Sequence, residues 1–179
     1  MSFEVIKCNI DGLLEIRPVI HEDSRGYFFE QYSEEKYRDF GIKSNFVQDN
    51  ISVSKKYVLR GMHFQKKYPQ GKLITVLKGV IYDVAVDLRP ESSTYLKYHG
   101  LILDSKIHNQ FYIPEYFAHG FLVLSDSAMI SYKCTDFYHP EDEAGFMWND
   151  PKLAINWADY LENQLPVLSE KDTKYAPLK

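Results

Sequence analysis

The sequence predicts an all-β fold, a sandwich or a barrel. Short runs rich in β-branched and aromatic residues recur between turn residues, and aromatic residues make up 15% of the 179 positions. Helical periodicity is weak by comparison. Chains of this length rarely split into two domains, and no linker, repeat or low-complexity segment interrupts this one. We therefore expect a single domain over residues 1–179.

Nine segments carry the strand pattern: residues 13–20, 27–32, 46–53, 58–64, 73–88, 99–103, 110–113, 120–124 and 128–135. The segment that ends at Leu88 is the clearest, and a turn at Lys78-Gly79 divides it into two strands. Its second half alternates an apolar set with an acidic or small set: Tyr82, Val84, Val86 and Leu88 against Asp83, Ala85 and Asp87. We expect the apolar face to line the core.

Helices are expected to be few and peripheral, with one short helix near residues 33–40. Ser33 occupies a suitable N-cap position, and Lys36 stands at N3, where a capping box has Glu or Gln. After Trp157 the sequence mixes Pro, Asn, Ser and charged residues. We expect this tail to be an extended segment that lies over the domain.

Charge and composition exclude several classes of function. The net charge of -4 is spread over residues of both signs, so no basic surface for nucleic acid or for a membrane is indicated. No apolar run approaches the roughly 20 residues that cross a bilayer, and the N-terminus lacks a signal-like apolar stretch. Cys8 and Cys134 form no CxxC or Cys/His pattern. These features favour a cytoplasmic protein without disulfides or zinc.

Two histidines, His63 and His119, lie among apolar neighbours in strand-like segments. A neutral histidine near pH 7 is the commonest general base, although a core imidazole with one hydrogen bond is the alternative for each. A metal site is a further alternative. It is disfavoured because position 61 is Gly, so no His-x-His pair forms, and two imidazoles alone hold a transition metal poorly. We expect no metal.

Four other residues have a chemical and a structural interpretation. Lys72 opens an apolar strand, where its ammonium group either reaches solvent or faces a buried anion. Tyr132 is either a packed aromatic residue or a proton donor. Arg25 and Arg60 each precede a Gly, which permits a tight turn and leaves the guanidinium free to bind an oxyanion, although surface ion pairs explain them equally well.

Several motifs follow one another along the chain: Asp23-x-Arg25-Gly26-Tyr27-Phe28, Gln48-Asp49-Asn50, Leu59 to Gln65, Pro69 to Leu73, Asp83 to Arg89, Ile113 to Phe121, Tyr132 to Thr135, Glu141 to Glu143, Trp148 to Pro151 and Leu168 to Asp172. In this order they resemble the motifs of the dTDP-4-dehydrorhamnose 3,5-epimerase family. Small departures are Met62, where Leu is usual, and Cys134 and Phe137 after the tyrosine. The similarity covers nearly the whole chain.

The resemblance implies an all-β, cupin-like jelly-roll (double-stranded β-helix) with a few short peripheral helices. It also implies a homodimer with exchanged N-terminal strands, and catalysis without metal or organic cofactor. Four catalytic positions match. His63 matches the general base, Asp172 the carboxylate that orients it, Tyr132 the general acid on the other face of the sugar, and Lys72 the cation beside the C4 oxygen.

The substrate implied is a nucleotide-linked 4-keto-6-deoxyhexose, dTDP-4-dehydro-6-deoxy-D-glucose, which is converted to dTDP-4-dehydro-L-rhamnose. Removing the proton at C3 or C5 gives an enolate whose charge sits on the C4 oxygen, where a lysine stabilises it. Inversion needs a base on one face and an acid on the other. The positions matching substrate contacts are Arg25, Glu30, Gln48, Asn50, Arg60, His119, Glu143 and Lys171.

Two alternatives remain open from the sequence. Related enzymes epimerise only C3 or only C5, or isomerise the ketone, and product identity separates them from a 3,5-epimerase. A non-catalytic cupin-type binding module is the other alternative. It is disfavoured because a binder needs no opposed acid and base.

Overall fold

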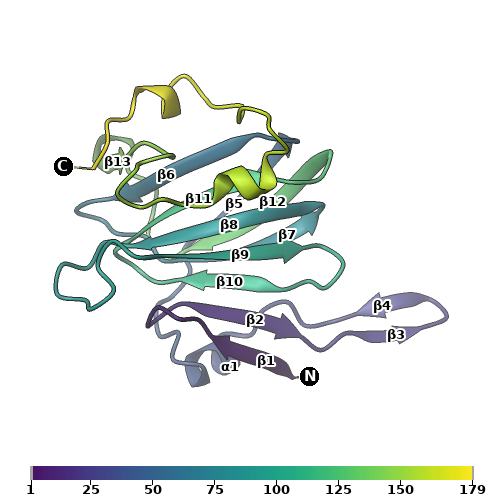
Figure 1. The fold of residues 1–179 in the computed structure, drawn as a ribbon. Coiled ribbons are helices and arrows are strands. Elements are labelled where there is room, and N and C mark those ends of the chain that lie inside the picture. The colour runs from purple at the N-terminus through teal and green to yellow at the C-terminus, as the bar shows by residue number, and fades with distance from the viewer. Residues whose placement is uncertain (1, 179) are drawn as a thin grey trace.

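The computed structural model describes residues 2–178, which form two antiparallel sheets packed against each other (Figure 1). The larger sheet has the strand order β1 (Phe3–Lys7), β2 (Leu14–Pro18), β10 (Gln110–Ile113), β7 (Lys72–Lys78), β12 (Ser127–Cys134) and β5 (Gln48–Lys55). The smaller has the order β13 (Glu143–Gly145), β6 (Leu59–Gln65), β11 (Phe117–Val123), β8 (Val80–Asp87) and β9 (Tyr98–Asp104). This is a cupin-like jelly-roll, as the resemblance implied.

The remaining elements are short. Strands β3 (His21–Asp23) and β4 (Gly26–Phe28) form a separate hairpin that projects from the sheets (Figure 1). The helices are α1 (Glu34–Asp39) and the 3-10 turns η1 (Pro140–Asp142), η2 (Trp157–Tyr160) and η3 (Asp172–Lys174). Helix α1 begins after Ser33 as predicted, but the Ser33 side chain makes no capping hydrogen bond.

The predicted turn at Lys78-Gly79 separates β7 from β8, and these strands lie in different sheets. Gly79 has a φ of +87°, and a Cβ there would lie 2.2 Å from the carbonyl oxygen of Ser127. Only glycine tolerates both conditions. The turn therefore passes the chain from one sheet to the other at a point of close backbone approach.

The first core fills the space between the sheets, where Ile74, Ile81, Ala85, Phe111 and Phe121 are buried together. Burial of each large apolar side chain contributes about 1.5–3 kcal/mol, so this layer is the main cohesion between the two sheets. Strand β8 thus directs Ile81 and Ala85 inward. Asp83 and Asp87 belong to the same face by alternation and are fully buried.

The apolar set of β8 lines a core, as predicted, although this is not the core between the two sheets. Tyr82, Val84 and Val86 point to the outer face of the smaller sheet, where a second core buries them against Trp157 and Leu153. The indole Nε1 of Trp157 donates to the carbonyl of Trp148 at 2.8 Å. Both faces of β8 are buried because the chain after β13 covers the sheet, so alternation alone did not identify the inner face.

The tail after Trp157 lies over the domain as expected, although η2 and η3 interrupt its extended course. We call residues 165–178 the C-terminal strap. Val167 forms a parallel bridge with Val58, with its N–H donating to the carbonyl of Tyr57 at 2.8 Å. Further along, Met147 N–H donates to Ala176 O at 3.1 Å. These bonds fix both ends of the strap to the smaller sheet and its connecting loops.

Strand β1 was not predicted. It is short, lies at the edge of the larger sheet and pairs only with β2, from Phe3 opposite Pro18 to Lys7 opposite Leu14. A third core joins this edge to α1, where Ile16, Tyr37 and Ile42 are buried. The N-terminal segment is therefore held by strand pairing and by packing under the helix.

Candidate active site

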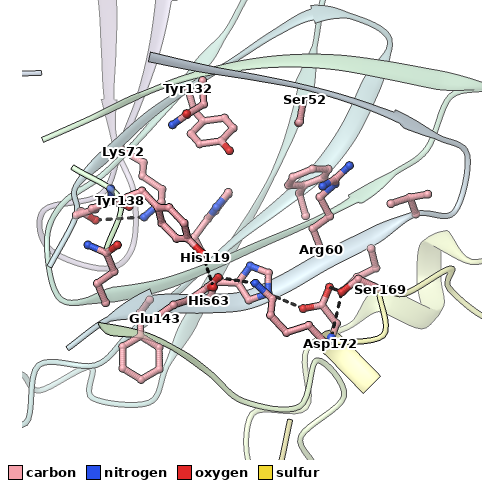
Figure 2. A pocket seen from close by; sticks show the side chains of 18 of the residues that line it. Ser52, Arg60, His63, Lys72, His119, Tyr132, Tyr138, Glu143, Ser169 and Asp172 are labelled. Atoms are coloured by element: carbon pink, nitrogen blue, oxygen red, sulfur yellow. Dashed lines mark hydrogen bonds and ion pairs between the residues drawn. The ribbon is translucent and has the colours of Figure 1, made fainter. Parts of the chain in front are cut away.

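A cavity of about 690 Å³ opens between the two sheets and the C-terminal strap (Figure 2). The smaller sheet contributes His63 from β6 and His119 from β11, and the larger sheet contributes Lys72 from β7 and Tyr132 from β12. Ten of the twelve predicted site residues line the cavity: Gln48, Asn50, Arg60, His63, Lys72, His119, Tyr132, Glu143, Lys171 and Asp172.

His63 is bound by a carboxylate from the strap. Its Nε2 lies 2.5 Å from Oδ1 of Asp172, which is buried although it lies 109 residues further along the chain. Ser169 Oγ donates to the other oxygen, Oδ2, at 2.8 Å. Burial acts to raise the pKa of Asp172, but the hydrogen bonds from His63 and Ser169 outweigh it and hold that pKa below its usual value. The ionised carboxylate thus keeps the proton of His63 on Nε2, leaving Nδ1 as the basic nitrogen.

His119 forms a second histidine–carboxylate pair. Its Nε2 lies 2.9 Å from both oxygens of Asp83, a fully buried residue on the neighbouring strand β8. Burial raises the pKa of Asp83, with His119 and Lys72 acting in the opposite direction. This pair is built wholly from the smaller sheet.

Two glycines let the histidine-bearing strands approach each other. Strand β6 pairs with β11 so that His63 lies opposite His119, with an irregular register between His119 and Phe121. A Cβ on Gly61 would lie 2.5 Å from Gly120 Cα, and Gly61 has a φ of +128°. Since any larger residue would push the backbones apart, the Arg-Gly-x-His sequence has a structural reason for its glycine.

Lys72 and Tyr132 form the opposite wall. Burial lowers the pKa of Lys72, while Cys134, Asp83 and Glu115 act to raise it. Among residues 2–178, its Nζ donates one hydrogen bond, a long one of 3.4 Å to the carbonyl of Gln70. Burial raises the pKa of Tyr132, which keeps its phenol protonated. Within residues 2–178 the Tyr132 hydroxyl has no hydrogen-bond partner, so both groups are available to a ligand.

Polar side chains extend the cavity away from the histidines. The Arg60 guanidinium is held by Ser54 Oγ through its Nε at 3.1 Å and its Nη2 at 3.0 Å. Gln48 donates to Asn50 at 3.1 Å on strand β5. These side chains form a row of donors along one side, suited to the oxygen atoms of a polar ligand.

At the mouth, the strap is tied to β13. Lys171 Nζ donates to Glu143 Oε1 at 2.6 Å, and the Tyr138 hydroxyl donates to Glu143 Oε2 at 2.8 Å. Burial acts to raise the pKa of Glu143, yet these two donors lower it. Lys171 and Glu143 thus neutralise each other in this chain.

Two predicted site residues lie elsewhere. Arg25 is at the tip of the β3–β4 hairpin, with its side chain 88% exposed and bound to Asp23 at 2.6 Å. Glu30 follows that hairpin and pairs with Lys36 of α1. Within the described single chain, neither residue lines the cavity.

Three residues of the site were not predicted from the sequence: Asp83 and Ser169, which support the two histidine–carboxylate pairs, and Tyr138, which lines the cavity. Asp83 carried a signal, since a carboxylate within a strand-forming run is costly to bury without a partner. Ser169 lies in the Leu168 to Asp172 motif, and nothing in its local sequence indicated that it would bind the carboxylate of Asp172.

Among residues 2–178, no three His, Cys, Asp or Glu side chains are grouped as metal ligands would be. In the same residues, no helix has the length and apolar character needed to span a membrane.

A jelly-roll with a carboxylate-bound histidine facing a tyrosine and a lysine across one cavity defines an enzyme of the acid–base class. A family model described as dTDP-4-dehydrorhamnose 3,5-epimerase matches residues 7–179. The chain belongs to this family, and is therefore an isomerase of the epimerase class.

Individual relatives agree with this assignment. The dTDP-4-dehydrorhamnose 3,5-epimerase of Methanothermobacter thermautotrophicus is 47% identical over 99% of this chain and 96% of its own length. The crystal structure of dTDP-6-deoxy-D-glucose-3,5-epimerase from Legionella pneumophila, in complex with dTDP-4-keto-L-rhamnose, superposes with a TM-score of 0.94 at 46% identity, covering 98% of this chain and 93% of that one. A 3′-monoepimerase from Streptomyces bikiniensis, in complex with dTDP-quinovose, has a TM-score of 0.87 at 30% identity over 95% and 85%.

Proposed function

We propose that this chain converts dTDP-4-dehydro-6-deoxy-D-glucose to dTDP-4-dehydro-L-rhamnose by inverting C3 and C5. The observation that carries the proposal is the opposition of His63 and Tyr132, which come from different sheets and line one cavity. Inversion needs a base on one face of the sugar and an acid on the other, and a binding site alone needs neither. The Legionella relative, solved with dTDP-4-keto-L-rhamnose, supports the choice of substrate class.

In the proposed mechanism, Nδ1 of His63 removes the proton from C3 or C5. The electron pair of that C–H bond forms the enolate, and the negative charge moves to the C4 oxygen. Asp172 stabilises the resulting imidazolium through Nε2. The Tyr132 phenol then protonates the same carbon from the opposite face, which inverts the centre. Solvent afterwards restores the proton of Tyr132 and removes the one on His63.

Lys72 and His119 are proposed to act at the C4 oxygen. Among residues 2–178, Lys72 forms no ion pair within 4 Å, so a developing oxyanion is a favourable ligand for it. His119 is held by Asp83 through one ring nitrogen, which fixes the orientation of the ring toward the substrate. The burial of Lys72 strengthens its interaction with such an oxyanion, because charges interact more strongly at low dielectric.

The diphosphate and nucleoside are proposed to lie along the outer part of the cavity. Arg60, oriented by Ser54, offers the bidentate donors that suit a phosphate oxygen pair. Lys171 is a second cation at the mouth, and Gln48, Asn50 and Glu143 complete the predicted contacts. We also propose a cytoplasmic location, which the two free cysteines, Cys8 and Cys134, support.

A homodimer with exchanged N-terminal strands would bring Arg25 and Glu30 to the cavity of a second copy. The β3–β4 hairpin projects from the chain and exposes Tyr27 and Phe28 at 60% and 61% (Figure 1). Adjacent exposed aromatic side chains at such levels suit burial against another chain. Light scattering is the direct test, and a monomer at micromolar concentration would contradict this part of the proposal.

The test of function is incubation of the chelator-treated protein with dTDP-4-keto-6-deoxyglucose in deuterium oxide, followed by NMR of the sugar protons. We expect deuterium at both C3 and C5, and about a 10³-fold slower exchange in His63→Ala, in line with the loss of a general base. Exchange at one carbon only would replace the proposal with the single-centre alternative, which the 3′-monoepimerase relative represents. No exchange would refute it.

A further inference from the structure

The strap holds a short motif whose side chains are directed at the base. Ser169-Glu170-Lys171-Asp172 has the Ser-x-x-acid spacing of a capping box, in which the serine accepts the N–H of the acidic residue and the acid side chain returns to the serine N–H. The first half of that pattern is present, since Asp172 N–H donates to Ser169 Oγ at 3.1 Å.

The second half of the capping box differs, because the acid side chain does not return to the serine N–H. The Asp172 carboxylate accepts from the Ser169 hydroxyl with Oδ2, at 2.8 Å, and contacts His63 with Oδ1. A hydroxyl has one proton to donate and two lone pairs, so Ser169 Oγ donates to the carboxylate and accepts from the backbone without conflict. Both carboxylate oxygens thus have fixed partners, and Ser169 lines the cavity beside them (Figure 2).

We infer that Ser169 is a positioning residue for the proton-transfer reaction, which holds the strap-borne carboxylate in the one orientation that serves His63. The inference deepens the proposed function and rests on it for the identity of the reaction. Without the hydroxyl, Asp172 is free to rotate about its side chain or to return to the backbone, as in an ordinary capping box. Either change removes the carboxylate from Nε2 of the base.

The same hydrogen bond has an electrostatic consequence. Burial opposes the ionisation of Asp172, and the Ser169 hydroxyl is one of the donors that lower its pKa. Removing that donor raises the pKa of the carboxylate. Because Asp172 contacts the proposed base, the acid limb of a plot of log kcat/KM against pH then shifts, which a purely structural role would not produce.

The experiment compares Ser169→Ala, Ser169→Cys and Ser169→Thr in the deuterium-exchange assay. We expect kcat to fall about tenfold in the alanine variant, with KM within about twofold of wild type, because a hydrogen bond to a charged group is lost. The threonine variant retains the hydroxyl and restores kcat. The cysteine variant preserves size with a weak donor, so it reports the hydrogen bond even if the alanine variant does not fold.

Thr173→Val is the matched control, because Thr173 is exposed on the same strap and its hydroxyl donates to the carbonyl of Glu170, away from the base. It should retain wild-type kcat and an unshifted acid limb. Loss of activity in this control equal to that in Ser169→Ala would overturn the inference, as would a wild-type kcat and pH profile in both Ser169→Ala and Ser169→Cys.

A substrate-free measurement separates this inference from the proposed function. The ring N–H signal of His63 in 15N-histidine NMR, assigned by its loss in His63→Ala, should shift in Ser169→Ala and stay in place in Thr173→Val. An unchanged signal in Ser169→Ala would overturn the positioning role whatever the substrate. Absence of deuterium exchange in the wild-type protein, with the NMR shift present, would refute only the proposed reaction.

Discussion

His63 and His119 lie opposite each other on neighbouring strands, yet their carboxylates come from different kinds of element. Asp83 stands on β8, the other neighbour of β11, so regular sheet pairing alone brings it to His119. Asp172 reaches His63 from the C-terminal strap, an irregular segment joined to the domain by the bridge between Val167 and Val58 and by hydrogen bonds further along. The sheet-built pair is thus part of the scaffold, and the strap-built pair depends on a separate segment.

Exposure follows the same division. The His119 and Asp83 side chains are 12% and 0% exposed, whereas the His63 side chain is 28% exposed beside a carboxylate at 2%. The proposed base therefore has access to the cavity on one side and a shielded carboxylate on the other. The comparison indicates that this chain supplies the carboxylate partner of His119 from the sheet, and that of His63, the proposed base, from the strap.

The largest expected effect is a difference in stability between variants of the two histidine–carboxylate pairs. Asp83→Ala leaves a buried donor on His119 without its acceptor, and we expect the free energy of unfolding to fall by about 3 kcal/mol. Asp172→Ala should cost only about 1 kcal/mol, because the strap can adjust around His63. Urea denaturation of both variants measures the difference. Equal losses would show that the strap is as much a part of the scaffold as the sheet.

The sequence predicted more of the fold than of the supports of the site. Strand runs and the Lys78-Gly79 turn were found because alternation and a glycine are local signals. The inward direction of Asp83 was not, because the covering of β8 by Trp157 and its neighbours is a tertiary fact. Alternation gives two faces and does not say which one meets the other sheet.

The pairing of His63 with Asp172 could not be predicted from local sequence patterns. His63 was recognised as a candidate from its apolar surroundings, but Asp172 entered only through the family resemblance, since no spacing rule joins residues 109 positions apart. The structure brings both to one cavity with Lys72 and Tyr132. Arg25 and Glu30 were predicted as substrate contacts by the same resemblance, and in the described chain they lie outside this cavity.

A second prediction tests the close approach of the strands that carry both histidines. Gly61→Ala places a Cβ 2.5 Å from Gly120 Cα and 2.9 Å from the carbonyl oxygen of His119. Gly26→Ala is a matched control, because Gly26 has a φ of +127° and open space around its Cβ position. We expect Gly61→Ala to cost about 2 kcal/mol more than Gly26→Ala in unfolding free energy, since overpacking adds to the shared backbone strain. Similar losses would mean that β6 and β11 separate freely.

The smallest expected effect is a pH dependence of opposite sign for the two carboxylates. The folded pKa of Asp172 is lowered, so its ionised form stabilises the protein above the usual pKa, near 4, and this contribution is lost as the pH falls below that value. Wild type should therefore be more stable than Asp172→Asn at pH 7. We expect this difference in unfolding free energy to shrink by about 1 kcal/mol or less between pH 7 and pH 3.

For Asp83 burial raises the pKa, so any stability due to its protonated form is present below the usual pKa and is lost as the pH rises through the raised value. The unfolding free energy of wild type should then fall relative to that of Asp83→Asn as the pH rises. This is the opposite of the trend expected for Asp172. Parallel denaturation series for both variants provide the measurement. Curves of the same sign would remove the electrostatic distinction between the two pairs and leave only the difference in the elements that carry them.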